Sequence, residues 1–170
     1  SPRIARDALA LRSQMAHAVD HGFWPTPEQE LLLRAALLRA DQAEAAFHSW
    51  ESRIVFDDLE YGSIRLLPLL YQNLVDQRIG ATSSLIGRLR GIYRQTWYKN
   101  QMLLDALSQV LTRFSEAGMP TLVLKGVPLA LCYYPSVALR PMLDADILVP
   151  EDRATEALDV ALSAGLRPTV

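Results

Sequence analysis

Two segments determine most of the architecture of this chain: Thr121-Leu-Val-Leu-Lys125-Gly126-Val-Pro-Leu-Ala-Leu131 and Leu139-Arg140-Pro141-Met-Leu-Asp144-Ala-Asp146-Ile-Leu-Val149. The first begins as a short apolar run, which is typical of a strand, and its glycine then opens a helical pattern. The second is an apolar strand pattern that carries two carboxylates. We expect the two strands to lie in a small mixed β-sheet.

Asp144 and Asp146 are two positions apart in the second predicted strand, residues 142–149. Because successive side chains of a strand point to opposite faces, the two aspartates should share one face, and Leu143 and Ala145 should line the other. The Cα atoms of the aspartates would lie about 6–7 Å apart. Two carboxylates at that spacing repel each other unless a cation lies near both of them. The spacing therefore lets the two carboxylates converge on one divalent cation.

These motifs resemble the DNA polymerase β superfamily of nucleotidyltransferases, and within it the bacterial family of uncharacterised nucleotidyltransferases. That family has Leu-Lys-Gly after its first strand and Arg-Pro-Met shortly before an Asp-x-Asp strand. This chain has the same motifs in the same order and at the same spacing, as Leu124-Lys125-Gly126 and Arg140-Pro141-Met142-Leu143-Asp144-Ala145-Asp146. The likeness extends upstream through residues 67–74 and the long helix that follows, so it covers the chain from about Glu28 onward.

The resemblance implies an activity and a role for each matching residue. The expected activity is Mg²⁺-dependent or Mn²⁺-dependent transfer of a nucleoside monophosphate from an NTP to a hydroxyl or phosphate acceptor. That acceptor would be a small molecule, a protein or an RNA. Asp144 and Asp146 would be the catalytic residues and the metal ligands, and the nucleotide would be bound by Lys125, Gly126 and Arg140.

The superfamily's third carboxylate usually lies on a later strand, where it activates the attacking hydroxyl. No acidic residue follows Asp159, and residues 166–170 are predicted to begin a third strand. We therefore expect residues 119–170 to be the first part of a nucleotidyltransferase core that continues beyond Val170. Residues 1–170 alone should show little or no transfer.

Each candidate site residue also has a plainer interpretation. The superfamily usually has Gly-Ser or Gly-Gly at the first turn, whereas this chain has Lys125-Gly126-Val127, so the hydroxyl that would touch a phosphate is missing. Lys125 would then be a solvated side chain, and Arg140 would form an ordinary surface salt bridge. The two aspartates would be surface charges paired with Arg140 or Arg153. A catalytically silent binding or scaffold module is therefore an alternative function.

A toxin-type transferase that acts on RNA is another alternative. Basic and aromatic residues are interleaved between Arg88 and Lys99, a composition that also occurs on RNA-binding surfaces. The helical period places Tyr93 inward and both Arg90 and Arg94 on a shared outer face. We therefore interpret this segment as the solvated face of a helix.

Composition excludes several further classes. The chain has 170 residues, 21% of them charged, and a formal net charge of −2, so nothing indicates an extended nucleic-acid or membrane surface. Its apolar runs are short, and no signal-peptide pattern opens the printed sequence, so we expect a cytoplasmic protein with no membrane partner. Cys132 is the single cysteine and has no disulfide partner within the chain. We interpret Cys132 as a small buried hydrophobe.

The whole pattern predicts an α+β fold, with a helical module over residues 1–118 followed by the partial core. The module should contain helices over residues 4–19, 27–50, 64–76 and 85–117, the third of them interrupted or kinked near Pro68. Thr26 as N-cap, Pro27 and Gln29 give the second helix its start signal. The last helix has apolar residues at helical spacing and should end at Gly118. In the core we expect strands over residues 121–124 and 142–149 and helices over residues 127–134 and 151–164.

Overall fold

The computed structural model describes residues 24–167 and has the α+β fold that the sequence predicts. Its first part is helical and contains α2 (Pro27–Leu37), α3 (Ala40–Glu51), α4 (Tyr61–Gln77) and α5 (Leu85–Glu116). Its second part contains β1 (Leu122–Leu124), α6 (Gly126–Cys132), β2 (Asp146–Leu148) and α7 (Ala154–Ser163). Single 3₁₀ turns are η1 (Phe56–Asp58), η2 (Val137–Leu139) and η3 (Glu151–Arg153). The helix predicted over residues 4–19 lies outside the described residues.

Helix α2 begins as predicted but ends earlier. The Thr26 hydroxyl accepts a hydrogen bond from the Gln29 N–H at 3.2 Å, and the Gln29 side chain accepts one from the Thr26 N–H at 2.9 Å. This reciprocal pair is a capping box. The single helix predicted as far as Trp50 is wrong, because α2 ends at Leu37 and α3 begins at Ala40, which has a φ of 51°.

Polar side chains of α4 stabilise this break between α2 and α3. Asn73 donates to the carbonyl oxygens of Ala35 at 2.8 Å and Leu38 at 3.0 Å. Gln77 donates to the Leu38 carbonyl at 3.2 Å and accepts from the Ala40 N–H at 2.6 Å. These bonds satisfy backbone groups that the end of one helix and the start of the next leave open. The partners are more than thirty residues away in sequence, so local periodicity does not reveal the break.

Helix α4 continues through Pro68 without the predicted interruption. A proline inside a helix removes one backbone hydrogen bond and costs about 3 kcal/mol. The leucines around it have no solvent exposure, and burial of each contributes about 1.5–3 kcal/mol; they are Leu67, Leu70 and Leu74. Their packing against α2 and α3 offsets the cost of the proline.

Glu60 caps the N-terminus of α4 and joins it to α2. Its carboxylate accepts hydrogen bonds from the Ser63 hydroxyl, from the N–H groups of Ser63 and Gly62 and, at 3.1 Å, from the side chain of Gln29. Burial by itself would raise the pKa of Glu60, but these hydrogen bonds outweigh burial and lower the pKa. The stabilisation is complete above the unfolded pKa of about 4.3. It is lost as the pH falls through the lower pKa of the folded state.

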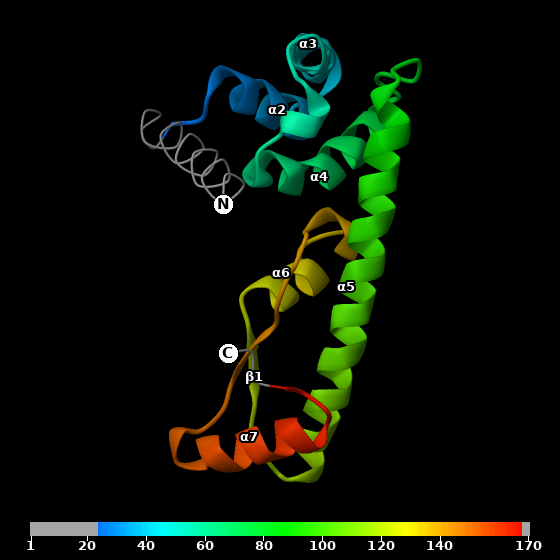
Figure 1. The fold of residues 1–170 in the computed structure, drawn as a ribbon. Helices are drawn as coiled ribbons and strands as arrows, with labels where there is room; N and C mark the ends of the chain where they lie inside the picture. Colours follow the sequence, from blue (N-terminus) through cyan, green and yellow to red (C-terminus); the bar gives the residue numbers. More distant parts are fainter. Residues whose placement is uncertain (1–23, 168–170) are drawn as a thin grey trace, which may run out of the picture.

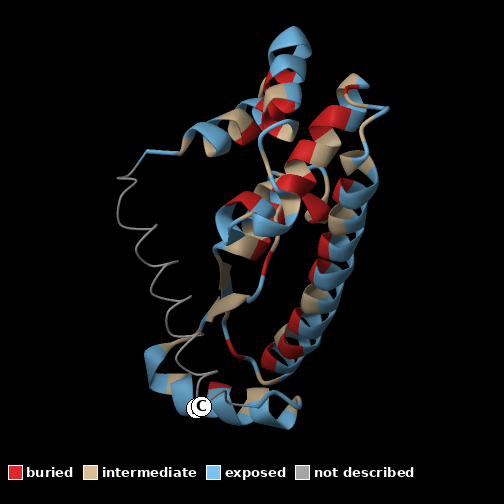
Figure 2. Cartoon of the chain, turned by 45° about the horizontal axis from the view of Figure 1, so that its top comes forward, coloured by how far each residue is buried: buried red, intermediate tan, exposed pale blue. Residues whose placement is uncertain are grey.

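Helix α5 connects the two parts of the molecule and runs along one side of it (Figure 1). Its 32 residues span roughly 48 Å. It ends as predicted, because Gly118 has a φ of 60° and the Met119 N–H donates to the Phe114 carbonyl at 2.8 Å. The predicted inward face is confirmed, since buried residues follow one side of the helix (Figure 2) and include Leu89, Thr96, Leu107, Val110 and Phe114.

Buried apolar residues gather at both ends of α5. The helical core lies among α2, α3, α4 and the first turns of α5, and it contains Phe47, Trp50 and Leu89. The sheet core lies among the second half of α5, the strands, α6 and α7, and it contains Leu107 and Val127. None of the helices in residues 24–167 is both long and apolar enough to span a membrane.

Strands β1 and β2 are antiparallel, with Leu124 opposite Asp146. The second strand begins only at Asp146, so the strand predicted from residue 142 is too long. Residues 142–145 are irregular, and Leu143 is 78% exposed instead of lining a buried face. Ala145 does pack against the sheet core as predicted, and Ile147 packs there as well. Leu166 and Arg167 are not in a strand, and residues 168–170 lie outside the described residues.

Candidate functional site

Lys125 and Asp146 form the centre of the candidate site. Leu124 ends β1 opposite Asp146, the first residue of β2, so the register of the sheet brings the next residue, Lys125, to the same end. The Lys125 Nζ atom lies 3.0 Å from Oδ1 of Asp146 and donates a hydrogen bond to it. The lysine side chain is 72% exposed and the aspartate side chain 36%, so the pair is open to solvent.

The backbone of Lys125 is unusual for a residue with a side chain. Its φ of 57° and ψ of −111° lie in a region that favours glycine. Such a conformation costs on the order of 1–3 kcal/mol and is most frequent at functional sites. Here it turns the chain sharply from β1 into α6 and directs the lysine side chain toward Asp146.

Asp144 lies near the same ammonium group. The hydrogen bond from Lys125 to Asp146, the charge of Asp146 and the charge of Asp144 together raise the pKa of Lys125 above its ordinary value. Asp144 is exposed, and within residues 24–167 no cationic side chain lies within 4 Å of it. The charges of both aspartates therefore act on one ammonium group, although Asp144 precedes the strand instead of lying on it.

Arg140 and Met142 cover Gly126 at the start of α6. A Cβ atom added to Gly126 would lie 3.4 Å from the Met142 sulfur and 3.9 Å from the Arg140 Nε atom, so both side chains lie within van der Waals reach of this position. Arg140 Nε is buried and has no hydrogen-bond partner in the described part of the chain. The surface salt bridge considered for Arg140 is absent there, and Arg153 instead pairs with Glu156 at 2.6 Å.

Asn100 holds the segment that leads into the two aspartates. It has no solvent exposure, and its amide nitrogen donates to the carbonyl oxygens of Val137 at 2.6 Å and Arg140 at 2.8 Å. Its amide oxygen accepts from the Met142 N–H at 3.2 Å. Sequence reasoning did not select this residue. The available signal was an amide on the inward face of α5, between Thr96 and Leu107, where a buried polar group needs partners.

The basic segment of α5 is placed as the sequence predicts. Arg90 and Arg94 are exposed, whereas Tyr93 packs inward against Tyr71, with ring centroids 5.3 Å apart. The Tyr93 hydroxyl also hydrogen bonds to Ser136 at 3.1 Å. Trp97 and Tyr98 remain partly exposed on the same helix.

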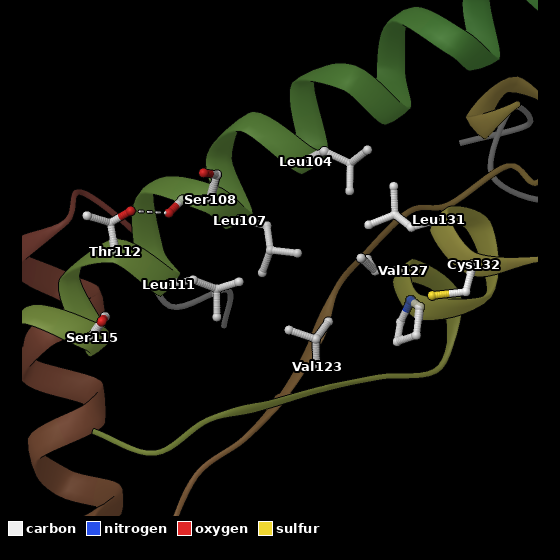
Figure 3. A pocket seen from close by; sticks show the side chains of 11 residues that line it. Leu104, Leu107, Ser108, Leu111, Thr112, Ser115, Val123, Val127, Leu131 and Cys132 are labelled. Carbon is white, nitrogen blue, oxygen red and sulfur yellow. Dashed lines mark hydrogen bonds between the residues drawn. The ribbon is translucent and has the colours of Figure 1, made fainter. Parts of the chain in front are cut away.

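A wide apolar pocket of about 570 Å³ lies between α5 and α6 (Figure 3). Cys132 is exposed at this pocket, so the interpretation of Cys132 as a buried residue is wrong. The reason is that α6 ends at Cys132 and turns only its other face, with Val127 and Ala130, into the sheet core. The lining contains no charged side chain, so this pocket offers no counter-charge to nucleotide phosphates.

The motifs that carry Lys125, Asp144 and Asp146 resemble those of nucleotidyltransferases, and the comparison with known families agrees. The family described as "Uncharacterised nucleotidyltransferase" matches residues 63–169, which is more than half of the chain. The chain belongs to this family, as the sequence motifs predict. The match includes all five candidate site residues, whereas α2 and α3 precede it. Neither the curated proteins nor the solved structures gave a significant match.

Proposed function

We propose that this protein transfers a nucleoside monophosphate from an NTP to a hydroxyl or phosphate acceptor with the help of Mg²⁺ or Mn²⁺. Membership of the family supports a general nucleotidyltransferase role. The observation that carries the finer proposal is the position of the Lys125 ammonium, which is bonded to Asp146 and attracted by Asp144. A position at which two carboxylates attract the same cation is suited to a divalent metal ion.

Asp144 and Asp146 are suited to form part of a binding site for Mg²⁺ or Mn²⁺. Asp144 and Asp146 supply hard carboxylate oxygens, and Mg²⁺ usually takes one or two carboxylates and completes its shell with water and substrate phosphates. Residues 24–167 contain no cluster of three or more acidic, histidine or cysteine side chains that would hold the ion alone. When bound, the ion would neutralise phosphate charge and orient the triphosphate.

The cationic residues would handle the triphosphate. Lys125 is mostly exposed, so its ammonium can leave Asp146 for a phosphate oxygen when a metal ion takes its place. Arg140 has an unsatisfied donor beside Gly126, and a guanidinium binds phosphate oxygens well. Because α6 has only seven residues, its dipole is short, and these two side chains would contribute more than the helix end.

The proposed reaction is a direct displacement. The acceptor oxygen forms a bond to the α-phosphorus, while the bond from that phosphorus to the bridging oxygen breaks. Pyrophosphate leaves with the electron pair, and the acceptor proton passes to a base, for which the resemblance implies a third carboxylate on a later strand. The chain's part would be positioning and charge neutralisation.

The test is incorporation of nucleotide labelled at the α-phosphate by the full-length protein, assayed over candidate acceptors with Mg²⁺ or Mn²⁺. Asp144→Asn and Asp146→Asn should each reduce labelling by on the order of a hundredfold or more, because the amide keeps the shape and removes the charge. Asp159→Asn is the matched control, since Asp159 is an exposed aspartate on α7. Unchanged labelling by Asp144→Asn would contradict the metal-ligand role.

A catalytically silent binding module is the second candidate. It is favoured by the Lys125-Gly126-Val127 turn, which lacks a hydroxyl, and by the two-carboxylate set in residues 24–167. This candidate predicts metal-dependent NTP binding by the full-length protein with no labelled product for any acceptor. Weakened NTP binding in Lys125→Ala would then show that the same site binds without catalysis.

A further inference from the structure

A small pocket with a mixed apolar and cationic lining lies between the helical module and the candidate site. Its volume is about 130 Å³, and helices α4 and α5 form its walls together with residues 141–143. Leu143, which lines it, is the residue directly before Asp144. The pocket is thus separate from the Lys125 and Gly126 turn, yet it adjoins the segment that carries the carboxylates.

Two cationic side chains line this pocket, one from each helix. Arg65 belongs to α4 and Lys99 to α5, and neither has an acidic side chain within 4 Å in the described part of the chain. Arg65 contacts the face of Tyr61 at 5.7 Å and makes only a long hydrogen bond, 3.5 Å, to the Pro141 carbonyl. Gln95 adds a neutral polar group to the lining. The pocket therefore presents two positive charges that the described residues leave uncompensated.

Neighbouring acidic groups are already engaged or lie outside the pocket. Glu60, next to Tyr61, accepts hydrogen bonds from Gly62, Ser63 and Gln29, and it does not line the pocket. Asp144 is adjacent in sequence but is also not part of the lining. An anion that enters the pocket would be the main counter-charge for Arg65 and Lys99.

We propose that this pocket binds the anionic group of a small acceptor molecule, a phosphate or a carboxylate, and so places the acceptor beside Asp144. The inference rests on the proposed function and deepens it by naming the acceptor class. Because one water occupies about 30 Å³, a pocket of about 130 Å³ has room for one small anionic group. Arg65 offers the planar pair of donors that suits both carboxylate and phosphate.

The test measures binding apart from catalysis. Isothermal titration of the protein would use glycerol 3-phosphate as the phosphate probe, glutarate as the carboxylate probe and glycerol as the uncharged control. At least one anion should bind, and glycerol should not. Arg65→Ala and Lys99→Ala should each raise the Kd of that anion by about tenfold, which corresponds to the loss of one charge-assisted hydrogen bond. Arg94→Ala is the matched control, because Arg94 is exposed on α5 outside the pocket.

Titration of the same variants with Mn²⁺ and ATP separates this pocket from the donor site. Arg65→Ala and Lys99→Ala should leave the affinity for Mn²⁺–ATP unchanged, whereas Lys125→Ala should weaken it. Loss of ATP binding in Arg65→Ala would make the pocket part of the donor site and overturn the acceptor assignment. Failure of both anions to bind, or binding only of a short RNA through Arg65 and Lys99, would overturn it as well. Anion binding that depends on Arg65, without any nucleotide transfer, would support the pocket and count against the proposed enzymatic function.

Discussion

At the residue scale, the Lys125 ammonium links the candidate site residues, because it donates a hydrogen bond to Asp146 and the charge of Asp144 also acts on it. The Lys-Gly and Asp-x-Asp motifs selected Lys125, Gly126, Asp144 and Asp146. Their placement around one ammonium depends on the register that sets Leu124 opposite Asp146, and that pairing is not written in either motif. For the same reason the sequence suggested Arg140 or Arg153 as partners of the aspartates, whereas Lys125 is the cation that bonds to Asp146.

Asn100 gives a test of how the site is held. Asn100→Ala would leave the carbonyls of Val137 and Arg140 and the N–H of Met142 without their buried partner. We expect a loss of about 1–3 kcal/mol in the free energy of unfolding, measured by urea denaturation. Because the segment before Asp144 would lose its anchor, the affinity for Mn²⁺–ATP should also fall.

Asn73→Ala is the control for this experiment. Asn73 is likewise a buried asparagine that donates to two backbone carbonyls, but it lies in α4 and serves the break between α2 and α3. Its replacement should cost a similar amount of stability and leave the affinity for Mn²⁺–ATP unchanged. Equal loss of affinity in both variants would mean that Asn100 acts only through global stability.

At the scale of elements, the sequence predicts a helix or its end where a strong local signal is present. It does not predict boundaries that depend on contacts with distant parts of the chain. Helix α5 follows from its spacing of apolar residues, and its end follows from Gly118. The start of α2 follows from its capping box. The break before Ala40 depends on side chains from α4, and the late start of β2 depends on Asn100, which holds Met142 in an irregular segment. Those contacts join residues more than thirty positions apart.

Two glycines associated with α5 should respond to alanine with opposite signs. Gly91 lies inside the helix, where an added Cβ meets no atom within 4 Å, so Gly91→Ala should stabilise the protein by about 0.5–1 kcal/mol. Gly118 also has free space, but its φ of 60° is strained for alanine, so Gly118→Ala should cost about 1 kcal/mol. Urea denaturation of both variants checks the signs. A loss of stability in Gly91→Ala would contradict the exposed position of that face.

At the scale of the whole molecule, α5 belongs to both cores, although the sequence predicts a boundary near residue 118. Its first turns pack in the helical core through Leu89, and its second half packs in the sheet core through Leu107. Residues 140–142, which lead into the two aspartates, are tied to α5 by Asn100. A shared rigid helix would keep the pocket that contains Arg65 and Lys99 in a fixed position relative to Asp144.

The helical core and the sheet core should respond separately to a loss of packing in one of them. Leu107→Ala removes a buried side chain that packs with Val127 and Met142, and it should cost about 2–5 kcal/mol. Hydrogen exchange should then become faster for amides of β1, β2 and α6 and stay slow in α2 and α3, because regions with separate packing open separately. Leu89→Ala, in the helical core, should show the reverse pattern. If both variants accelerate exchange equally along the chain, α5 couples the cores into one cooperative unit, and a boundary near residue 118 would have no energetic meaning.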